Sequence, residues 1–170
     1  MSAIAAAQES AGVVQWSYSG CPFILGMKIN RVNVGKLGSD YQCEGFVEWA
    51  KSQLAILPPQ LPVVMLNRYA SQAFGLNEIN SASERPLVYF SKIHHRTSPE
   101  FLAEFGEHIV DTTCEIAKQR RVYLVRPIPE MGFDVPKTLS RRLALGLREE
   151  VSIPIEDYRK RNQWVWAAQD

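Results

Sequence analysis

Two short apolar runs constrain the fold of this chain more than any other feature. "LPVVMLN" covers residues 61–67 and "RRVYLVR" covers residues 120–126, and each has the length of one β-strand. An uninterrupted apolar run is typical of a strand that a parallel sheet buries on both faces. Between the runs, Ser98 and Pro99 are a helix N-cap and a first helical residue, and apolar residues follow at helical spacing. A strand, a helix and a strand in this order predict a right-handed βαβ unit.

Further helical and extended patterns surround this unit. "YQCEGFVEWAKSQLAILPP", residues 41–59, places Phe46, Trp49, Ala50 and Leu54 on one helical face before two prolines end it. The other predicted elements are helices over residues 2–10, after Pro136 and after Pro154, strands over Val13–Ser17 and within residues 86–92, and loops over residues 22–40 and 68–96. The alternation of helices and strands predicts an α/β fold with three layers, α/β/α, around a parallel sheet.

The composition excludes several classes of protein. With 170 residues, the chain has the size of one domain with a real core. The net charge is +1 and no stripe of lysine and arginine is present, so we expect no nucleic-acid partner. No apolar stretch reaches the length of a transmembrane helix, and the first residues lack the basic region of a signal peptide. Taken alone, these residues favour a cytoplasmic chain.

The three cysteines leave two interpretations open. Cys21, Cys43 and Cys114 are too widely spaced for a CxxC redox site or a zinc knuckle. Cys21 and Cys43 could form a disulfide in an oxidising compartment. Alternatively, all three are unpaired small residues of the core. The spacing itself does not decide between these possibilities, and we expect no metal and no cofactor.

Polar residues follow the predicted strands, where ligands bind in open α/β sheets. A Gly20 N–H and an Asn67 side chain from neighbouring strand ends could form an oxyanion hole. The alternative is a turn glycine and an asparagine that caps the loop backbone. Arg68 and Arg126 could line the same mouth and bind an anionic group, or they could pair with acids.

A proline-rich loop follows the strand of residues 120–126. It contains Pro127, Pro129 and Pro136, with Glu130 among them. The prolines stiffen a loop that borders the predicted mouth. Because the chain shows no partner base or nucleophile for Glu130, we expect this carboxylate to hold the loop in place rather than to catalyse a reaction.

No complete catalytic set is visible in the sequence. GxSxG, P-loop and GxGxxG motifs are all absent. His94 and His95 are adjacent, so their side chains point in different directions and make a weak metal pair. A small hydrolase that uses these histidines in an unconventional site therefore has little support.

Several segments resemble one known family in the right order. "GVVQWSYSGCP", "CEGFVEWA", "LPVVMLNRYA" and "RVYLVRPIPEMGFDVPKTLSRRL…SIPIEDYRKRN" are similar to the SGNH-type extracytoplasmic domain fused to membrane acyltransferases of the acyltransferase-3 family. The resemblance implies an SGNH-hydrolase, flavodoxin-like fold that faces the periplasm from an inner-membrane protein. It also implies transfer of an acyl group, typically acetyl, to lipopolysaccharide or another surface polysaccharide by a Ser-His-Asp site. The acyl donor would come from the fused membrane domain.

The resemblance also assigns expected roles to individual residues. The family's Gly-Asp-Ser and Asp-x-x-His blocks do not occur in the sequence, so residues 1–170 are expected to be a partial, inactive SGNH domain with those blocks before Met1 and after Asp170. Gly20 matches the family's oxyanion-hole glycine. Asn67 lies near its asparagine, although "LNRYA" departs from the Gly-x-Asn-Asp pattern. A periplasmic location further implies the Cys21–Cys43 disulfide. Alternative functions are a carbohydrate esterase and a non-catalytic carbohydrate-binding or docking module.

Overall fold

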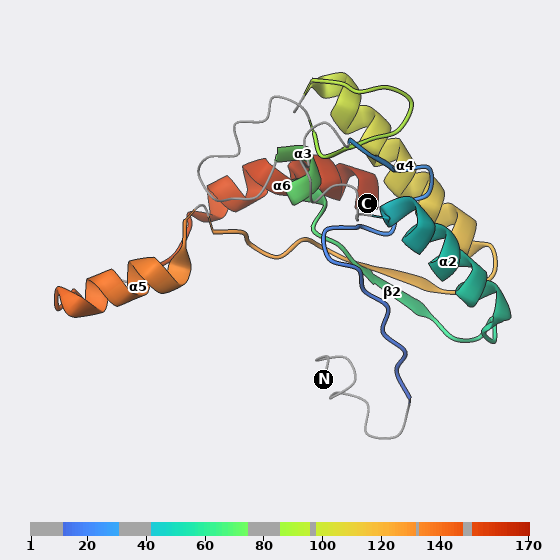
Figure 1. Ribbon diagram of the computed structural model, residues 1–170, viewed down its shortest axis with the longest axis horizontal. Helices are drawn as coiled ribbons and strands as arrows, with labels where there is room; N and C mark the ends of the chain where they lie inside the picture. The colour runs from blue at the N-terminus through green and yellow to red at the C-terminus, as the bar shows by residue number, and fades with distance from the viewer. Residues whose placement is uncertain (1–11, 31–41, 75–85, 96–97, 132, 148–150) are drawn as a thin grey trace.

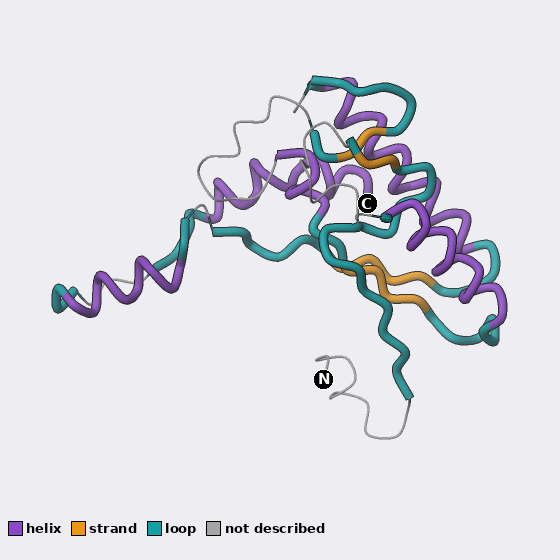
Figure 2. The backbone as a smooth tube through the Cα atoms, viewed as in Figure 1, coloured by secondary structure: helices purple, strands orange, loops and turns teal. Residues whose placement is uncertain are grey.

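The computed structural model describes residues 12–30, 42–74, 86–95, 98–131, 133–147 and 151–170. Figure 1 shows the arrangement of helices and strands, and Figure 2 colours them by type. In chain order they are β1 (Lys28–Ile29), α2 (Cys43–Ile56), β2 (Val63–Leu66), α3 (Tyr69–Phe74), β3 (Val88–Tyr89), α4 (Pro99–Ala117), β4 (Val122–Val125), α5 (Val135–Ala144) and α6 (Ile155–Gln169). The helices predicted after residue 41, Ser98, Pro136 and Pro154 are confirmed.

The predicted βαβ unit is also confirmed. β2 and β4 form a parallel pair in which Val63 lies opposite Val122 and Leu66 lies opposite Val125. α4 connects them in the chain and contacts β4. A second, antiparallel pair joins β1 to β3, with Ile29 opposite Val88. The two pairs are separate sheets, so the mixed α/β class is confirmed while the parallel part is small.

The prediction that both faces of the parallel pair are buried is wrong for the residues described. Side chains alternate along the strands, because successive residues of a strand point to opposite faces. Met65 faces the interior and is 6 % exposed. On the other face, four apolar side chains are between 36 % and 60 % exposed, namely Val64, Leu66, Tyr123 and Val125. Within the described ranges, the strand pair and the helices on its buried face make two of the three predicted layers.

Three local predictions differ from the structure. Val13–Ser17 is not a strand: it is an unpaired segment in which Val14 is 67 % exposed. β1 lies in the predicted loop of residues 22–40. It is a strand because its backbone pairs with β3, which is distant in the sequence, and side-chain spacing does not reveal such a pairing. α3 begins directly after Arg68 in the predicted long loop, because Tyr69 and Ala73 pack into the core. The helix predicted for residues 2–10 lies outside the described residues.

The main core forms where α4 meets α3 and α6. Phe101, Phe105 and Ile109 form the apolar stripe of α4 and are fully buried. The ring of Phe105 meets Tyr69 of α3 edge to face at 6.1 Å between centroids, and Trp164 of α6 at 5.2 Å. Perpendicular rings are a favourable arrangement because the positive edge of one meets the negative face of the other. This aromatic cluster fixes α3, and with it the exit of β2.

A buried arginine connects α2 to the parallel pair. Arg120, two residues before the start of β4, is 7 % exposed. Its guanidinium donates to the carbonyls of Leu54 at 2.6 Å and Leu57 at 3.3 Å, with longer contacts to Pro58 and Leu61 at 3.5 Å. The last carbonyls of a helix have no partner inside the helix. Arg120 therefore caps α2 and fixes the turn that leads into β2.

We expect Arg120→Met to lower the free energy of unfolding by about 1–3 kcal/mol, because it removes the guanidinium that donates to the partly buried carbonyls of Leu54 and Leu57 while keeping the apolar volume. Urea unfolding followed by circular dichroism measures this change. Arg121→Met is the matched control, since Arg121 is exposed, and it should change stability by less than about 0.5 kcal/mol. Equal effects of the two substitutions would contradict the role assigned to Arg120.

Candidate functional site

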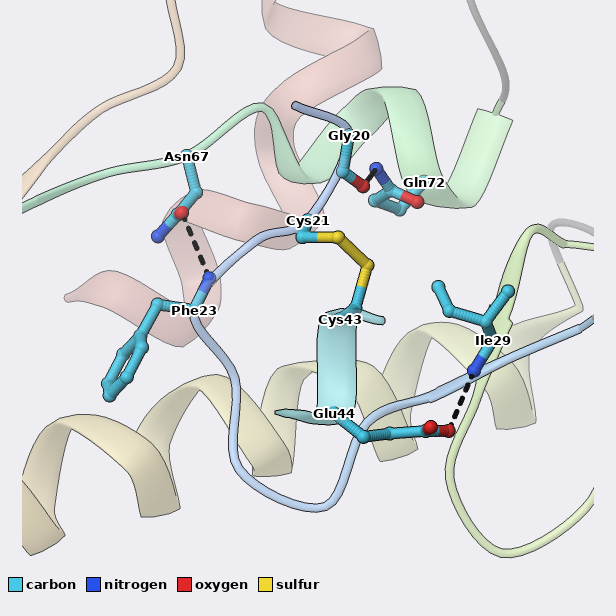
Figure 3. The surroundings of a disulfide bond; sticks show 8 residues. All are labelled: Gly20, Cys21, Phe23, Ile29, Cys43, Glu44, Asn67 and Gln72. Carbon is cyan, nitrogen blue, oxygen red and sulfur yellow. Dashed lines mark hydrogen bonds between the residues drawn. A yellow bond between two sulfur atoms is a disulfide. The ribbon is translucent and has the colours of Figure 1, made fainter. Parts of the chain in front are cut away.

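A disulfide ties the loop after Gly20 to the start of α2 (Figure 3). Cys21 and Cys43 are bonded, their Cα atoms are 5.2 Å apart, and 22 positions separate them in sequence. Both are buried, whereas Cys114 is an exposed free cysteine on α4. Because the crosslink closes a loop of about this size, it restricts the unfolded chain and stabilises the fold by roughly 3 kcal/mol. The crosslink therefore holds the loop after Gly20 against the start of α2.

Asn67 and Gln72 fasten the same loop from the other side. The Phe23 N–H donates to Asn67 Oδ1 at 3.2 Å, and Gln72 Nε2 donates to the Gly20 carbonyl at 3.0 Å. Gly20 has φ of +73°, a left-handed conformation that glycine adopts without strain. Figure 3 shows both contacts around the disulfide. The two predicted oxyanion-hole residues therefore belong to one small network at the carboxyl end of β2.

The Asn67 side chain is largely engaged in this network. Its Nδ2 donates to the Tyr69 hydroxyl at 2.8 Å. Burial raises the pKa of Tyr69 to about 12, although the hydrogen bond from Asn67 lowers it in part. The phenol therefore stays protonated at neutral pH and does not act as a base. An amide nitrogen carries two hydrogens, so Asn67 has one N–H left that could face a substrate.

The predicted mouth residues Arg68 and Glu130 are brought into contact. Glu130 has a side chain that is 5 % exposed. Its Oε1 accepts from Arg68 Nε at 2.9 Å, and its Oε2 accepts from Arg161 of α6 at 2.9 and 2.7 Å. Hydrogen bonds between charged groups are the strong ones. The carboxylate thus joins the end of β2, the proline-rich loop and α6.

Arg126 lies with the end of α6. Its guanidinium donates to Asp170 at 2.6 Å and lies 5.3 Å from the centre of the Trp166 ring. Nearby, the Tyr158 hydroxyl donates to the Pro127 carbonyl. α6 therefore bonds the proline-rich loop at both Pro127 and Glu130. The Arg126 guanidinium forms a salt bridge with the Asp170 carboxylate.

A serine, a glutamate and a histidine meet at the start of α4, in an order that does not suit nucleophilic catalysis. Glu104 accepts from the Ser91 hydroxyl through Oε1, and its Oε2 lies 2.9 Å from His94 Nε2. The carboxylate stands between the serine and the imidazole, so His94 is not placed to take the proton of Ser91. His108 is used structurally as well: it bonds the Leu25 carbonyl at 3.0 Å and stacks on a phenylalanine.

An aromatic groove lies between the Val13–Ser17 segment and α2. Its volume is about 460 Å³. The lining residues are Gln15, Trp16, Ser17, Tyr18, Gln42, Phe46 and Trp49. Trp49 is 46 % exposed, and Trp16 meets it edge to face at 5.4 Å. Sequence reasoning assigned Phe46 and Trp49 to a buried helical face. The alternation of aromatic and polar residues over 15–18 is the one signal that could have suggested an open surface.

Neither a cluster of metal ligands nor a membrane-spanning helix is present among the residues that the structure describes. No group of three or more histidine, cysteine, aspartate or glutamate side chains there is arranged to hold a metal ion. No helix within the described ranges is both long enough and apolar enough to cross a membrane.

Comparison with known proteins gives one match. A family model described as "SGNH domain (fused to AT3 domains)" matches residues 1–170, which is the entire chain. No curated protein and no solved structure matches the sequence. The resemblance inferred from the sequence segments is confirmed at the level of the family.

We expect Glu130→Ala to lower the free energy of unfolding by about 2–3 kcal/mol, because it leaves the partly buried Arg161 without its carboxylate. The loop of residues 126–131 should also become more sensitive to limited proteolysis. Arg68→Ala removes a cation that is 56 % exposed, so it should cost less than about 1 kcal/mol. Proteolysis of this loop that is unchanged by Glu130→Ala would contradict the proposed anchoring.

Glu104 should make stability depend on acid pH. Burial raises the pKa of Glu104, but hydrogen bonds from Ser91 and His94 outweigh it, so the pKa lies below the ordinary value of 4.5. A carboxyl whose pKa is lowered by folding stabilises the native state above its unfolded pKa and loses that contribution as pH falls through the folded value. Urea midpoints should therefore fall between about pH 5 and pH 3, and Glu104→Gln should reduce this slope. Glu107→Gln, at an exposed position of the same helix, should leave the slope unchanged.

Proposed function

Because the chain belongs to the family of SGNH domains fused to AT3 domains, we propose that it is part of a surface-polysaccharide O-acyltransferase. In this proposal, an acyl group of acetyl type passes from the AT3 membrane domain to a hydroxyl of lipopolysaccharide or a related glycan. The family match over all 170 residues is the observation that carries the proposal. The domain faces the periplasm, and the Cys21–Cys43 disulfide supports an oxidising compartment.

The reaction uses a serine, a histidine and an aspartate. The serine oxygen attacks the acyl carbonyl while the histidine takes its proton, and the donor's leaving group departs with that proton. The acceptor hydroxyl then attacks the acyl-serine, and the serine recovers its proton. The Gly-Asp-Ser and Asp-x-x-His blocks that supply these residues in the family do not occur in this sequence. We therefore place them on segments outside residues 1–170, which makes this chain a partial domain that is inactive alone.

Gly20 and Asn67 would serve the oxyanion of each tetrahedral intermediate. Both are held by one network at the carboxyl end of β2, where ligands bind in open α/β sheets. The backbone N–H of Gly20 and the remaining N–H of Asn67 are suitable donors. Because Asn67 also supports Phe23 and Tyr69, its substitution affects the loop as well as the reaction.

The open face of the parallel pair supports a domain with a further layer. Four apolar side chains that alternate along β2 and β4 are exposed there. Covering about 100 Å² of apolar surface contributes roughly 2.5 kcal/mol. In the complete three-layer SGNH fold, this face is covered by a segment outside the described residues.

The aromatic groove supports the second candidate function, carbohydrate binding. Trp16 and Trp49 offer flat apolar faces that suit the C–H face of a sugar ring, and Gln15 and Gln42 offer amides that suit its hydroxyls. In an acyltransferase this groove would hold the acceptor. It would also serve a non-catalytic module, or an esterase that transfers the acyl group to water.

Hydrolysis of p-nitrophenyl acetate tests where the nucleophile lies. We expect residues 1–170 alone to show only background turnover, because the Gly-Asp-Ser block is absent. A longer polypeptide that contains this domain, the missing catalytic blocks and the AT3 domains should acylate the glycan. Mass spectrometry of the glycan measures the added acyl group. Enzymatic turnover by residues 1–170 that is lost in Ser91→Ala, or on substitution of another internal serine, contradicts the proposal.

Trp49→Ala should weaken glycan binding by roughly two- to tenfold, because an aromatic contact is worth about 0.5–1.5 kcal/mol. Ile56→Ala of the same helix is the control.

A further inference from the structure

α5 stands apart from the rest of the molecule. Figure 1 shows it projecting away from the other helices. No residue of α5 is buried. Four leucines along α5 and its C-terminal turn are between 41 % and 75 % exposed, namely Leu139, Leu143, Leu145 and Leu147. So many exposed leucines on one short segment indicate a surface that binds something else.

Residues at each end of α5 cap the helix. Asp134 caps the first turn by accepting from the Lys137 N–H at 2.9 Å. At the other end, the Gly146 N–H bonds the Leu143 carbonyl at 3.1 Å and the Leu147 N–H bonds the Arg142 carbonyl at 2.9 Å. Gly146 has φ of +70°, as a helix-ending turn of this type requires. The segment is thus built as a helix although none of its residues is buried, and a helix of this length is marginal in water by itself.

α5 is amphipathic and basic. At 100° per residue, Leu139 and Leu143 lie on one face and Lys137 and Arg141 lie on the other. Residues 135–147 contain three basic side chains and no acidic one. An apolar stripe with lysine and arginine opposite is the pattern of a helix that lies in the surface of a membrane.

The residues that precede α5 are bonded to α6. Glu130, just before α5, is bonded to Arg161 of α6, and the Pro127 carbonyl accepts from Tyr158. α6 is also the next helix in the chain after α5. The residues that precede α5 are therefore anchored on α6, and the residues after α5 lead into it.

We propose that α5 binds the surface of a lipid bilayer that contains anionic lipids, with its leucines among the acyl chains and its cations at the headgroups. The charge of residues 135–147 complements anionic lipid. The family is defined by fusion to AT3 domains, which places this domain beside a membrane. A second copy of the chain is a poorer occupant because it would bring like charges together. The inference rests on the family and the geometry of α5, and it does not depend on the acyl-transfer proposal.

Co-sedimentation with sucrose-loaded vesicles tests this inference on the 170-residue chain. Vesicles contain phosphatidylcholine alone or phosphatidylcholine with phosphatidylglycerol. We expect binding to the anionic vesicles only, and weaker binding as salt is raised. The double variant Lys137→Gln/Arg141→Gln should reduce partitioning by roughly twenty-five-fold, since each cation near an anionic surface contributes about a fivefold factor.

The leucines are tested separately. Leu139→Asp/Leu143→Asp should abolish sedimentation, whereas Ile56→Asp on α2, at an apolar side chain that is 76 % exposed, should retain it. Because no buried side chain is altered, all variants should keep the circular dichroism spectrum of the parent chain. The salt dependence of binding by the unaltered chain is a second measurement, and it needs no variant. Absence of binding to anionic vesicles, or binding that the aspartates leave unchanged, overturns the inference. A parent chain that is dimeric by light scattering and becomes monomeric in Leu143→Asp also overturns it, in favour of self-association.

Discussion

The carboxylate of Glu130 is the contact on which the arrangement of this molecule depends. It is nearly excluded from water and bonds two arginines from distant segments, Arg68 after β2 and Arg161 in α6. Paired in this way, a buried charge is tolerated, and it fixes the geometry of every segment that contributes to the pair. The proline-rich loop, the exit of β2 and α6 are therefore joined at one carboxylate. The predicted mouth and the segment that leads into α5 both lie beside this carboxylate.

A second set of contacts holds the segment that precedes α2. The Cys21–Cys43 bond fixes one side of it, while Asn67 and Gln72 bond its backbone from the side of β2 and α3. The same restraints create two surfaces of different chemistry. The carboxyl end of β2 presents N–H donors, and the groove beside Trp49 presents aromatic faces and amides. These two surfaces are the ones to which we assign the oxyanion and the glycan in the proposed acyl transfer, whose nucleophile and base we place outside residues 1–170.

The exposed apolar surfaces of the chain lie in separate places and have different character. The open face of β2 and β4 is uncharged, so it suits a covering segment of protein. The surface of α5 combines leucines with cations and suits a lipid bilayer. Both agree with a domain that works as part of a larger membrane-bound protein, as its family membership indicates.

The sequence by itself determined the elements whose signals are local. The apolar runs of β2 and β4, the Ser98 and Pro99 start of α4, and the family resemblance were all readable, because N-caps, prolines and side-chain periodicity act within a few residues. The structural role of Glu130 was also suggested by the lack of any partner base nearby. The tertiary structure alone decided which distant residues meet: Arg161 with Glu130, Phe23 with Asn67, and β1 with β3. It also decided that β2 and β4 keep one face open and that Trp49 is exposed. Burial depends on what covers a side chain, and no spacing within a strand or helix specifies that.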